Sequence, residues 1–222
     1  MNSDYKIIYE SNQLLIVNKP SGFIAEGNEF EARNMETIYL EYLKKKINHP
    51  FLGIPHRLDR VTSGVMIFAK KRGTLKKLNR WFEQGNIIKT YLAIVNDKPA
   101  IEKGILVNYL GKDLVNKKGI VIDKKHPGAK KAVLKFQILD SNEWGYLLEV
   151  KPLTGRYHQI RTQLAFIGSP IIGDTKYGSK KPYIEGQIAL HAKSVKFPNS
   201  VNHSPLLFEA DLPLTPLWSQ YR

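Results

Sequence analysis

One carboxylate set between two arginines is the most reactive arrangement in this sequence. The segment His56-Arg57-Leu58-Asp59-Arg60-Val61-Thr62-Ser63-Gly64 lies between Pro55 and an apolar stretch at 65–68. Neighbouring guanidinium groups favour the ionised form of a carboxyl group, so Asp59 could serve as a nucleophile or a base. A simpler alternative is that Asp59 and Thr62 form a hydrogen-bonded turn into a strand, with the arginines solvated. Taken alone, the segment does not separate the two interpretations.

A tyrosine on a predicted strand is the second candidate. In Lys89-Thr90-Tyr91-Leu92-Ala93-Ile94-Val95, the two-residue period of a strand places Lys89, Tyr91 and Ala93 on one face. Tyr91 could stack on a base or exchange a proton. The alternative is an ordinary core tyrosine among residues that favour strands.

The third candidate is a polar cluster at 153–161, Leu-Thr-Gly-Arg-Tyr-His-Gln-Ile-Arg. The pattern predicts a helix that begins near Thr154, with Thr154 as its N-cap. Free backbone N–H groups at that end, together with Arg156 and Arg161, would attract an anion. These two arginines lie about 140° apart on an ideal helix, whereas His158 and Arg161 share a flank. The alternative is a capped amphipathic helix with a solvated basic face.

Many short strands and few helices must position these residues. Without regular βαβ alternation, this pattern predicts an α+β fold around a mixed or antiparallel sheet. The absence of repeats and of a Ser/Gly linker predicts one domain over 1–222. Helices are expected at 36–47, at 75–84 and from 154, and strands at 6–9, 13–19, 64–70, 88–95, 104–110, 132–139, 145–151, 187–196 and 206–211.

Composition excludes several classes of protein. The 222 residues contain no cysteine, which rules out disulfides and cysteine-ligated zinc. There is no phosphate-cradling glycine loop, and the six histidines have no metal-ligand spacing, so neither a cofactor nor a metal is expected. No secretory signal and no membrane-length apolar stretch is present, and a cytoplasmic protein is expected.

Positive charge is concentrated in the middle of the chain. Residues 51–140 carry 19 basic and 7 acidic side chains, out of 34 and 20 in the whole chain. Lysines spread over several segments suit a phosphate backbone better than one small anion. On charge alone, a solvated basic surface is equally compatible with the sequence.

Together these blocks resemble the RluA-type RNA pseudouridine synthases. His56-Arg57-Leu58-Asp59 with Thr62-Ser63-Gly64 is similar to that family's signature around its catalytic aspartate. The likeness extends, in the family's order, through 18–22 (Asn-Lys-Pro-Ser-Gly), 89–91 (Lys-Thr-Tyr), 154–161, 173–178 (Gly-Asp-x-x-Tyr-Gly) and 190–192 (Leu-His-Ala).

The resemblance implies isomerisation of a uridine within ribosomal or transfer RNA to pseudouridine, with extrusion of the target base from a stem-loop. Asp59 would be the catalytic carboxylate, Tyr91 would lie against the uracil, and Arg161 would pair with Asp59. Arg57 would fill the gap left by the extruded nucleotide. The other expected substrate-binding residues are His56, Thr62, Lys89, Arg156 and His158.

The fold that the family implies is a long mixed, largely antiparallel sheet with flanking helices and a central basic cleft. Many relatives carry a basic RNA-binding domain before the catalytic one, whereas the first strand is expected here near Lys6, so a stand-alone catalytic domain and a monomer are expected. Val61 stands where relatives often have a polar or acidic residue. Substrate choice is assigned to loops at 23–36, 111–130 and 178–187.

Two other functions remain open at this point. A non-catalytic RNA-binding factor would need lysines facing phosphates but no carboxylate in a cleft. A glycosidase releasing free uracil would be expected to carry two carboxylates around the bond, and only Asp59 stands out.

Overall fold

The computed structural model describes residues 6–27, 33–198 and 206–221. Its strands form a ten-stranded sheet in the order β1-β2-β3-β9-β4-β8-β7-β5-β6, with β10 paired to β9. Every strand pair with a recorded register is antiparallel. The predicted α+β class with a largely antiparallel sheet is therefore confirmed.

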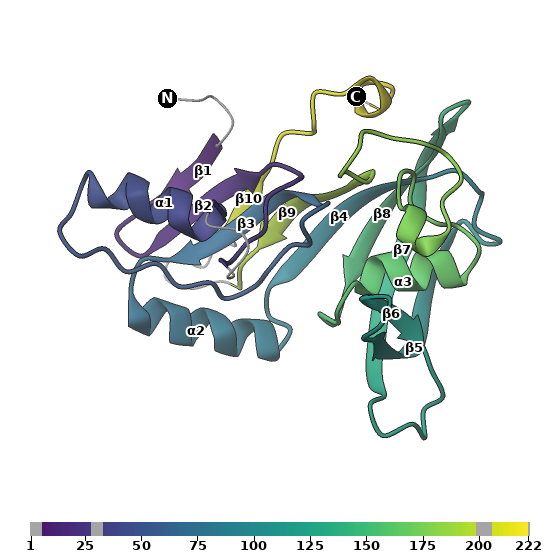
Figure 1. The fold of residues 1–222 in the computed structure, drawn as a ribbon, viewed down its shortest axis with the longest axis horizontal. Coiled ribbons are helices and arrows are strands. Elements are labelled where there is room, and N and C mark those ends of the chain that lie inside the picture. The colour runs from purple at the N-terminus through teal and green to yellow at the C-terminus, as the bar shows by residue number, and fades with distance from the viewer. Residues whose placement is uncertain (1–5, 28–32, 199–205, 222) are drawn as a thin grey trace. The chain divides into compact units, whose positions relative to one another are not determined.

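The chain divides into two compact units, each described here by itself. Unit 1 comprises Met1–Ile88 and Ala192–Leu212, and unit 2 comprises Lys89–His191 and Pro213–Arg222. Unit 1 contains β1 Lys6–Glu10, β2 Leu14–Lys19, α1 Met35–Lys44, β3 Ser63–Ala69, α2 Arg72–Glu83 and β10 Leu207–Glu209. Unit 2 contains nearly all of β4 Ile88–Val95, then β5 Lys103–Asp113, β6 Lys118–Val121, β7 Lys130–Asn142, β8 Gly145–Pro152, α3 Gln159–Phe166, the 3-10 turn Thr175–Tyr177 and α4 Pro216–Ser219. Strand β9, Leu190–Lys196, crosses the division (Figure 1).

Unit 1 packs its helices around the fully buried strand β3. All seven residues of β3 are buried, as its continuous apolar sequence predicts. Helix α2 adds Leu78 to a core that contains Ile16, Ile67 and Phe208. The strand that directly follows the Asp59 segment is therefore held in the core of unit 1.

Unit 2 is built on long antiparallel ladders between β5, β7 and β8. Ile105 lies opposite Lys135, and Leu106 opposite Leu134, so adjacent residues point to opposite faces. Helix α3 packs on the face that carries Leu134, which is fully buried (Figure 1). That face forms the core of unit 2.

Most predicted elements are confirmed. The short helix α4 and the 3-10 turn Thr175–Tyr177 were not predicted. The predicted helix from Thr154 begins instead at Gln159, and β6 was not predicted because Lys118-Gly119 lacks the apolar alternation of a strand. In the described part of the chain, no helix is long and apolar enough to cross a membrane.

Candidate active site

Asp59 lies in a tight turn that leads into β3. The carbonyl of Asp59 accepts a hydrogen bond from Thr62 N at 3.0 Å. Gly22 N donates to the Arg60 carbonyl at 2.8 Å, and Ser21 Oγ donates to the Val61 carbonyl at 3.2 Å. Main-chain hydrogen bonds therefore fix the backbone that carries the half-buried Asp59 side chain.

Lys19, at the end of β2, ties this turn to the loop that follows β2. Its Nζ donates to the carbonyls of Pro20 at 2.9 Å, Phe23 at 2.8 Å and Arg60 at 3.2 Å. The side chain is completely buried. Three ammonium donors thus meet three carbonyl acceptors, the arrangement that a buried lysine needs.

Burial lowers the pKa of Lys19 to about 7, against the opposing effect of the Asp59 carboxylate and with a further lowering by Arg60. Loss of water penalises the charged amine, while the negative charge of Asp59 favours it. Lys19 is thus electrostatically coupled to the proposed catalytic carboxylate as well as bonded to its turn.

Gly64 fixes the other end of the turn. Its φ is +115°, and a Cβ atom there would lie 2.2 Å from the carbonyl oxygen of Ala192 and 2.6 Å from its nitrogen. Only glycine allows this conformation and this approach of two backbones. The turn of Asp59 therefore leads directly into a strand held against β9.

The neighbours of Asp59 have three different surroundings. Arg57 is exposed and pairs with Glu26, at 3.3 Å between Nη1 and Oε2. His56 Nε2 accepts a hydrogen bond from Ile67 N at 3.0 Å, which places its proton on Nδ1, and Thr62 is buried. His56 thus has a structural role on β3, and the substrate contacts predicted for all three residues stay predictions.

Tyr91 and Lys89 share one face of β4 in unit 2. Tyr91 lies opposite Val150 of β8, and the face of the sheet is the one that α3 covers. Both side chains are partly buried. Burial lowers the pKa of Lys89. The predicted face is confirmed, and the contact of Tyr91 with uracil stays a prediction.

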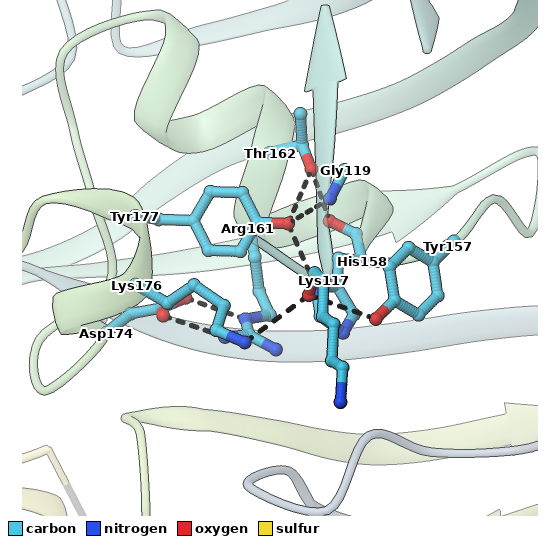
Figure 2. Close-up of polar contacts among 9 residues, drawn as sticks. All are labelled: Lys117, Gly119, Tyr157, His158, Arg161, Thr162, Asp174, Lys176 and Tyr177. Carbon is cyan, nitrogen blue, oxygen red and sulfur yellow. Dashed lines mark hydrogen bonds and ion pairs between the residues drawn. The ribbon is translucent and has the colours of Figure 1, made fainter. Parts of the chain in front are cut away.

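Arg161 is buried on the first turn of α3, where a carboxylate holds it. Its Nε donates to Asp174 Oδ2 at 2.7 Å and its Nη2 to Asp174 Oδ1 at 2.8 Å. Arg161 and Asp174 are only 6% and 1% exposed. Figure 2 shows this two-pronged pair, with the guanidinium 4.9 Å from the centre of the Tyr177 ring. A solvated basic face on this helix is therefore wrong, and the guanidinium has a fixed plane.

Tyr177 joins this arginine to strand β6. Its hydroxyl accepts from Gly119 N at 2.6 Å and lies 2.9 Å from His158 Nδ1 and 3.3 Å from Thr162 Oγ1 (Figure 2). Burial raises the pKa of Tyr177, so the hydroxyl keeps its proton. His158 also stacks on the exposed Tyr157 ring at 3.8 Å, so the polar residues of the third candidate segment form one network.

The start of α3 corrects the prediction for Thr154. The helix begins at Gln159, after His158 in a left-handed conformation, and no side chain caps it. Thr154 Oγ1 instead donates to Gln159 Oε1 at 2.7 Å and accepts from Val133 N at 2.9 Å. Arg156 lies before the helix, with its Nε bonded to the Lys131 carbonyl at 2.9 Å. Competing side-chain partners explain why Thr154 is not an N-cap.

Sequence reasoning from residue type alone did not find Lys19, Asp174 or Tyr177. All three lie in blocks that carry the family resemblance, which is the signal that could have identified them. Asp59 is in unit 1, and Tyr91 and Arg161 are in unit 2. The pairing of Arg161 with Asp59 stays a prediction beside the observed pair with Asp174. Among the described residues, no group of three His, Asp or Glu side chains could hold a metal ion.

Comparisons with known proteins bear directly on these residues. The model of the RNA pseudouridylate synthase family matches residues 13–166. A curated relative, ribosomal large subunit pseudouridine synthase C of Vibrio parahaemolyticus, is 33% identical over 206 residues, which cover 90% of this chain and 63% of the relative. Uncharacterized RNA pseudouridine synthase YhcT of Bacillus subtilis is 33% identical over 215 residues, covering 93% of this chain and 68% of the relative.

The fold has a matching precedent among solved structures. Human RNA pseudouridylate synthase domain containing 4 superposes with a TM-score of 0.78 at 23% identity, over 94% of this chain and 89% of that one. The chain spans about two thirds of the length of the first curated relatives. The family match includes Asp59, Tyr91 and Arg161 and covers more than half of the sequence. This chain therefore belongs to the RNA pseudouridylate synthase family.

Proposed function

We propose that this protein isomerises specific uridines of ribosomal or transfer RNA to pseudouridine, with Asp59 as the catalytic residue. The observation that carries the proposal is the family match over residues 13–166, which contains all three proposed catalytic residues. Several relatives are named for the large ribosomal subunit, which favours ribosomal RNA as the first substrate to test.

The reaction needs no net addition or loss of atoms. The bond between N1 of uracil and C1′ of the ribose breaks, the base turns, and a bond forms between C5 and C1′. The hydrogen at C5 leaves as a proton and N1 gains one. Asp59 either attacks the sugar or removes its 2′ proton, and Tyr91 lies against the uracil and assists removal of the C5 proton.

The remaining site residues act through binding and position. Arg161, whose plane Asp174 and Tyr177 fix, pairs with Asp59. Extrusion of a base costs a few kcal/mol, which contacts of lysines with the phosphate backbone offset. Arg57, which is exposed, moves into the space that the nucleotide leaves. His56, Thr62, Lys89, Arg156 and His158 are the further proposed substrate-binding residues. The protein acts in the cytoplasm as a monomer.

Asp59→Asn tests the proposal. Transcripts of ribosomal and transfer RNA carrying tritium at C5 of uridine release it as water when the new bond forms. We expect release with the wild type and none above background with Asp59→Asn, while RNA affinity and unfolding midpoint stay close to wild type. Asp97→Asn, an exposed carboxylate after β4, is the matched control and should retain full activity.

Three outcomes would contradict the proposal. RNA binding by the wild type without pseudouridine in any transcript would identify a non-catalytic RNA-binding factor. Release of free uracil would identify a glycosidase. Substantial residual activity in Asp59→Asn would exclude Asp59 as the catalytic residue.

A further inference from the structure

In unit 2, the side of the sheet that α3 does not cover is exposed along β5 and β7, where Ile105, Val107 and Lys135 are all exposed. Helix α3 is bonded to the other face, where Gln163 Nε2 donates to Asn108 Oδ1 at 2.7 Å. Asn108 lies opposite the fully buried Ala132, and Tyr91 is on that same face. The reverse face is thus on the opposite side of the sheet from Tyr91.

The registers of the strands define the side chains of this reverse face. Ile105 lies opposite Lys135, Val107 opposite Val133, and Tyr109 opposite Lys131. Cross-strand partners share a face, so these side chains form one continuous surface. Ile105 and Val107 are 58% and 54% exposed, and Leu153 beside them is 53% exposed. Exposed aliphatic side chains of this kind, grouped together, are typical of an interaction surface.

Lysines surround this apolar centre. Lys103, Lys131 and Lys135 are exposed, and Lys135 lies directly opposite Lys151 of β8. Like charges directly opposite each other destabilise a sheet, and a bound polyanion would relieve that repulsion. Glu149 neutralises the charge of one of these lysines, because its Oε1 accepts a hydrogen bond from Lys151 Nζ at 2.6 Å. The face is therefore complementary to a phosphate backbone.

We propose that this reverse face, defined by Lys103, Ile105, Val107, Lys131 and Lys135, is a second RNA-contact surface. This inference rests on the proposed function, because that function makes RNA the polyanion that the protein meets. Because it lies on the opposite side of the sheet from Tyr91, it binds a segment other than the target nucleotide. Lysines contact phosphates, and the aliphatic side chains pack on sugars and bases. The surface selects long, structured RNA over an isolated stem-loop.

The test is the triple variant Lys103→Gln/Lys131→Gln/Lys135→Gln in the full chain. Binding is measured over a range of salt concentrations to a long ribosomal RNA transcript and to the minimal stem-loop around its modified uridine. We expect about a tenfold increase in Kd for the long transcript and little change for the stem-loop. The slope of log K against log salt should fall by about two, because each phosphate contact with a single strand contributes roughly 0.7.

A control with the same charge change separates this surface from general charge. Lys44→Gln/Lys45→Gln/Lys76→Gln removes three exposed lysines of unit 1, at the end of α1, directly after it and on α2. It should leave the preference for the long transcript unchanged. The proposal is overturned if the reverse-face variant binds both RNAs like the wild type, the result expected if a protein occupies this face. Equal losses in both triple variants would also overturn it.

These binding results are independent of catalysis. If the wild type forms no pseudouridine, the proposed function fails, whatever the salt slopes show. If pseudouridine forms and the slopes do not change, the proposed function stands and the second surface fails.

Discussion

The two proposed catalytic charges are held in opposite ways. In unit 1, the turn of Asp59 is anchored through its backbone, with Lys19 and Gly22 both bonded to the Arg60 carbonyl. In unit 2, Arg161 is anchored through its own side chain by Asp174. A backbone anchor fixes a turn and leaves the side chain it carries available for substrate, whereas a buried ion pair fixes the guanidinium itself. Removing each anchor should therefore change the unfolding free energy and kcat in a different way.

Among substitutions at these anchors, Asp174→Asn should have the largest effect. The substitution removes the charge that balances the buried Arg161, and breaking such a pair costs about 3–5 kcal/mol of unfolding free energy. Because Arg161 would no longer be held in position, kcat should also fall by about 10²-fold. Urea unfolding measures the loss of stability, and tritium release measures the loss of kcat. Wild-type kcat in a folded Asp174→Asn protein would show that this pair does not position Arg161.

Lys19→Met is expected to have the next largest effect. It leaves the carbonyls of Pro20 and Phe23 without this donor, at a cost of about 2–3 kcal/mol. Because the turn of Asp59 loosens, kcat should fall while KM stays near its wild-type value. Lys76→Met, on the exposed face of α2, is the control. A rise in KM at unchanged kcat would indicate that Lys19 acts in binding instead.

The pH dependence of stability sharpens the same comparison. The pKa of Lys19 is about 7 in the folded protein and 10.5 in the unfolded chain, so between these values the unfolded state binds more protons. The unfolding free energy of the wild type relative to Lys19→Met should therefore rise with pH above 7, by up to about 1.4 kcal/mol per unit. Urea titrations at several pH values measure it. A constant difference would contradict the lowered pKa of Lys19.

Tyr177→Phe should have a smaller effect on the Arg161 side of the comparison. It leaves the buried Gly119 N without its acceptor, at a cost of about 1–2 kcal/mol, and keeps the ring beside Arg161. We expect a lower unfolding midpoint and a modest loss of kcat. If kcat instead falls as far as in Asp174→Asn, the hydroxyl controls the position of Arg161 as strongly as the ion pair does.

Arg57→Gln should have the smallest effect on stability. Its pair with Glu26 is exposed, and such pairs contribute about 0–0.5 kcal/mol. The unfolding midpoint should stay at the wild-type value while pseudouridine formation slows, because Arg57 is proposed to fill the space of the extruded nucleotide. A stability loss above 1 kcal/mol would show that Arg57 anchors the Asp59 turn.

Local patterns predicted most of the fold. The alternation at 132–139 and the apolar run at 64–70 both correspond to strands, because each side chain's burial follows from its place in the period. The start of α3 could not be predicted, since Thr154 bonds to Val133, 21 residues away. Local patterns likewise cannot predict the hydrogen bond between Gly119 and Tyr177, which are 58 residues apart in the sequence.

The candidate site was predicted unevenly for the same reason. Asp59 and Arg161 stand out by residue type, and both belong to the blocks that resemble the family. Their anchors do not stand out, because Lys19 is the last residue of an ordinary strand and Asp174 lies 13 residues beyond its arginine. Predicting a buried partner requires the tertiary structure that brings it there.

The contact of Gly64 with Ala192 has a practical consequence for engineering. The two main chains leave no room for even a methyl group, and the positive φ disfavours every other residue. Mutant libraries of this chain should therefore keep codon 64 constant. Diversity belongs in the exposed tip at Leu114 and Val115, which are 79% and 91% exposed and where changes are tolerated.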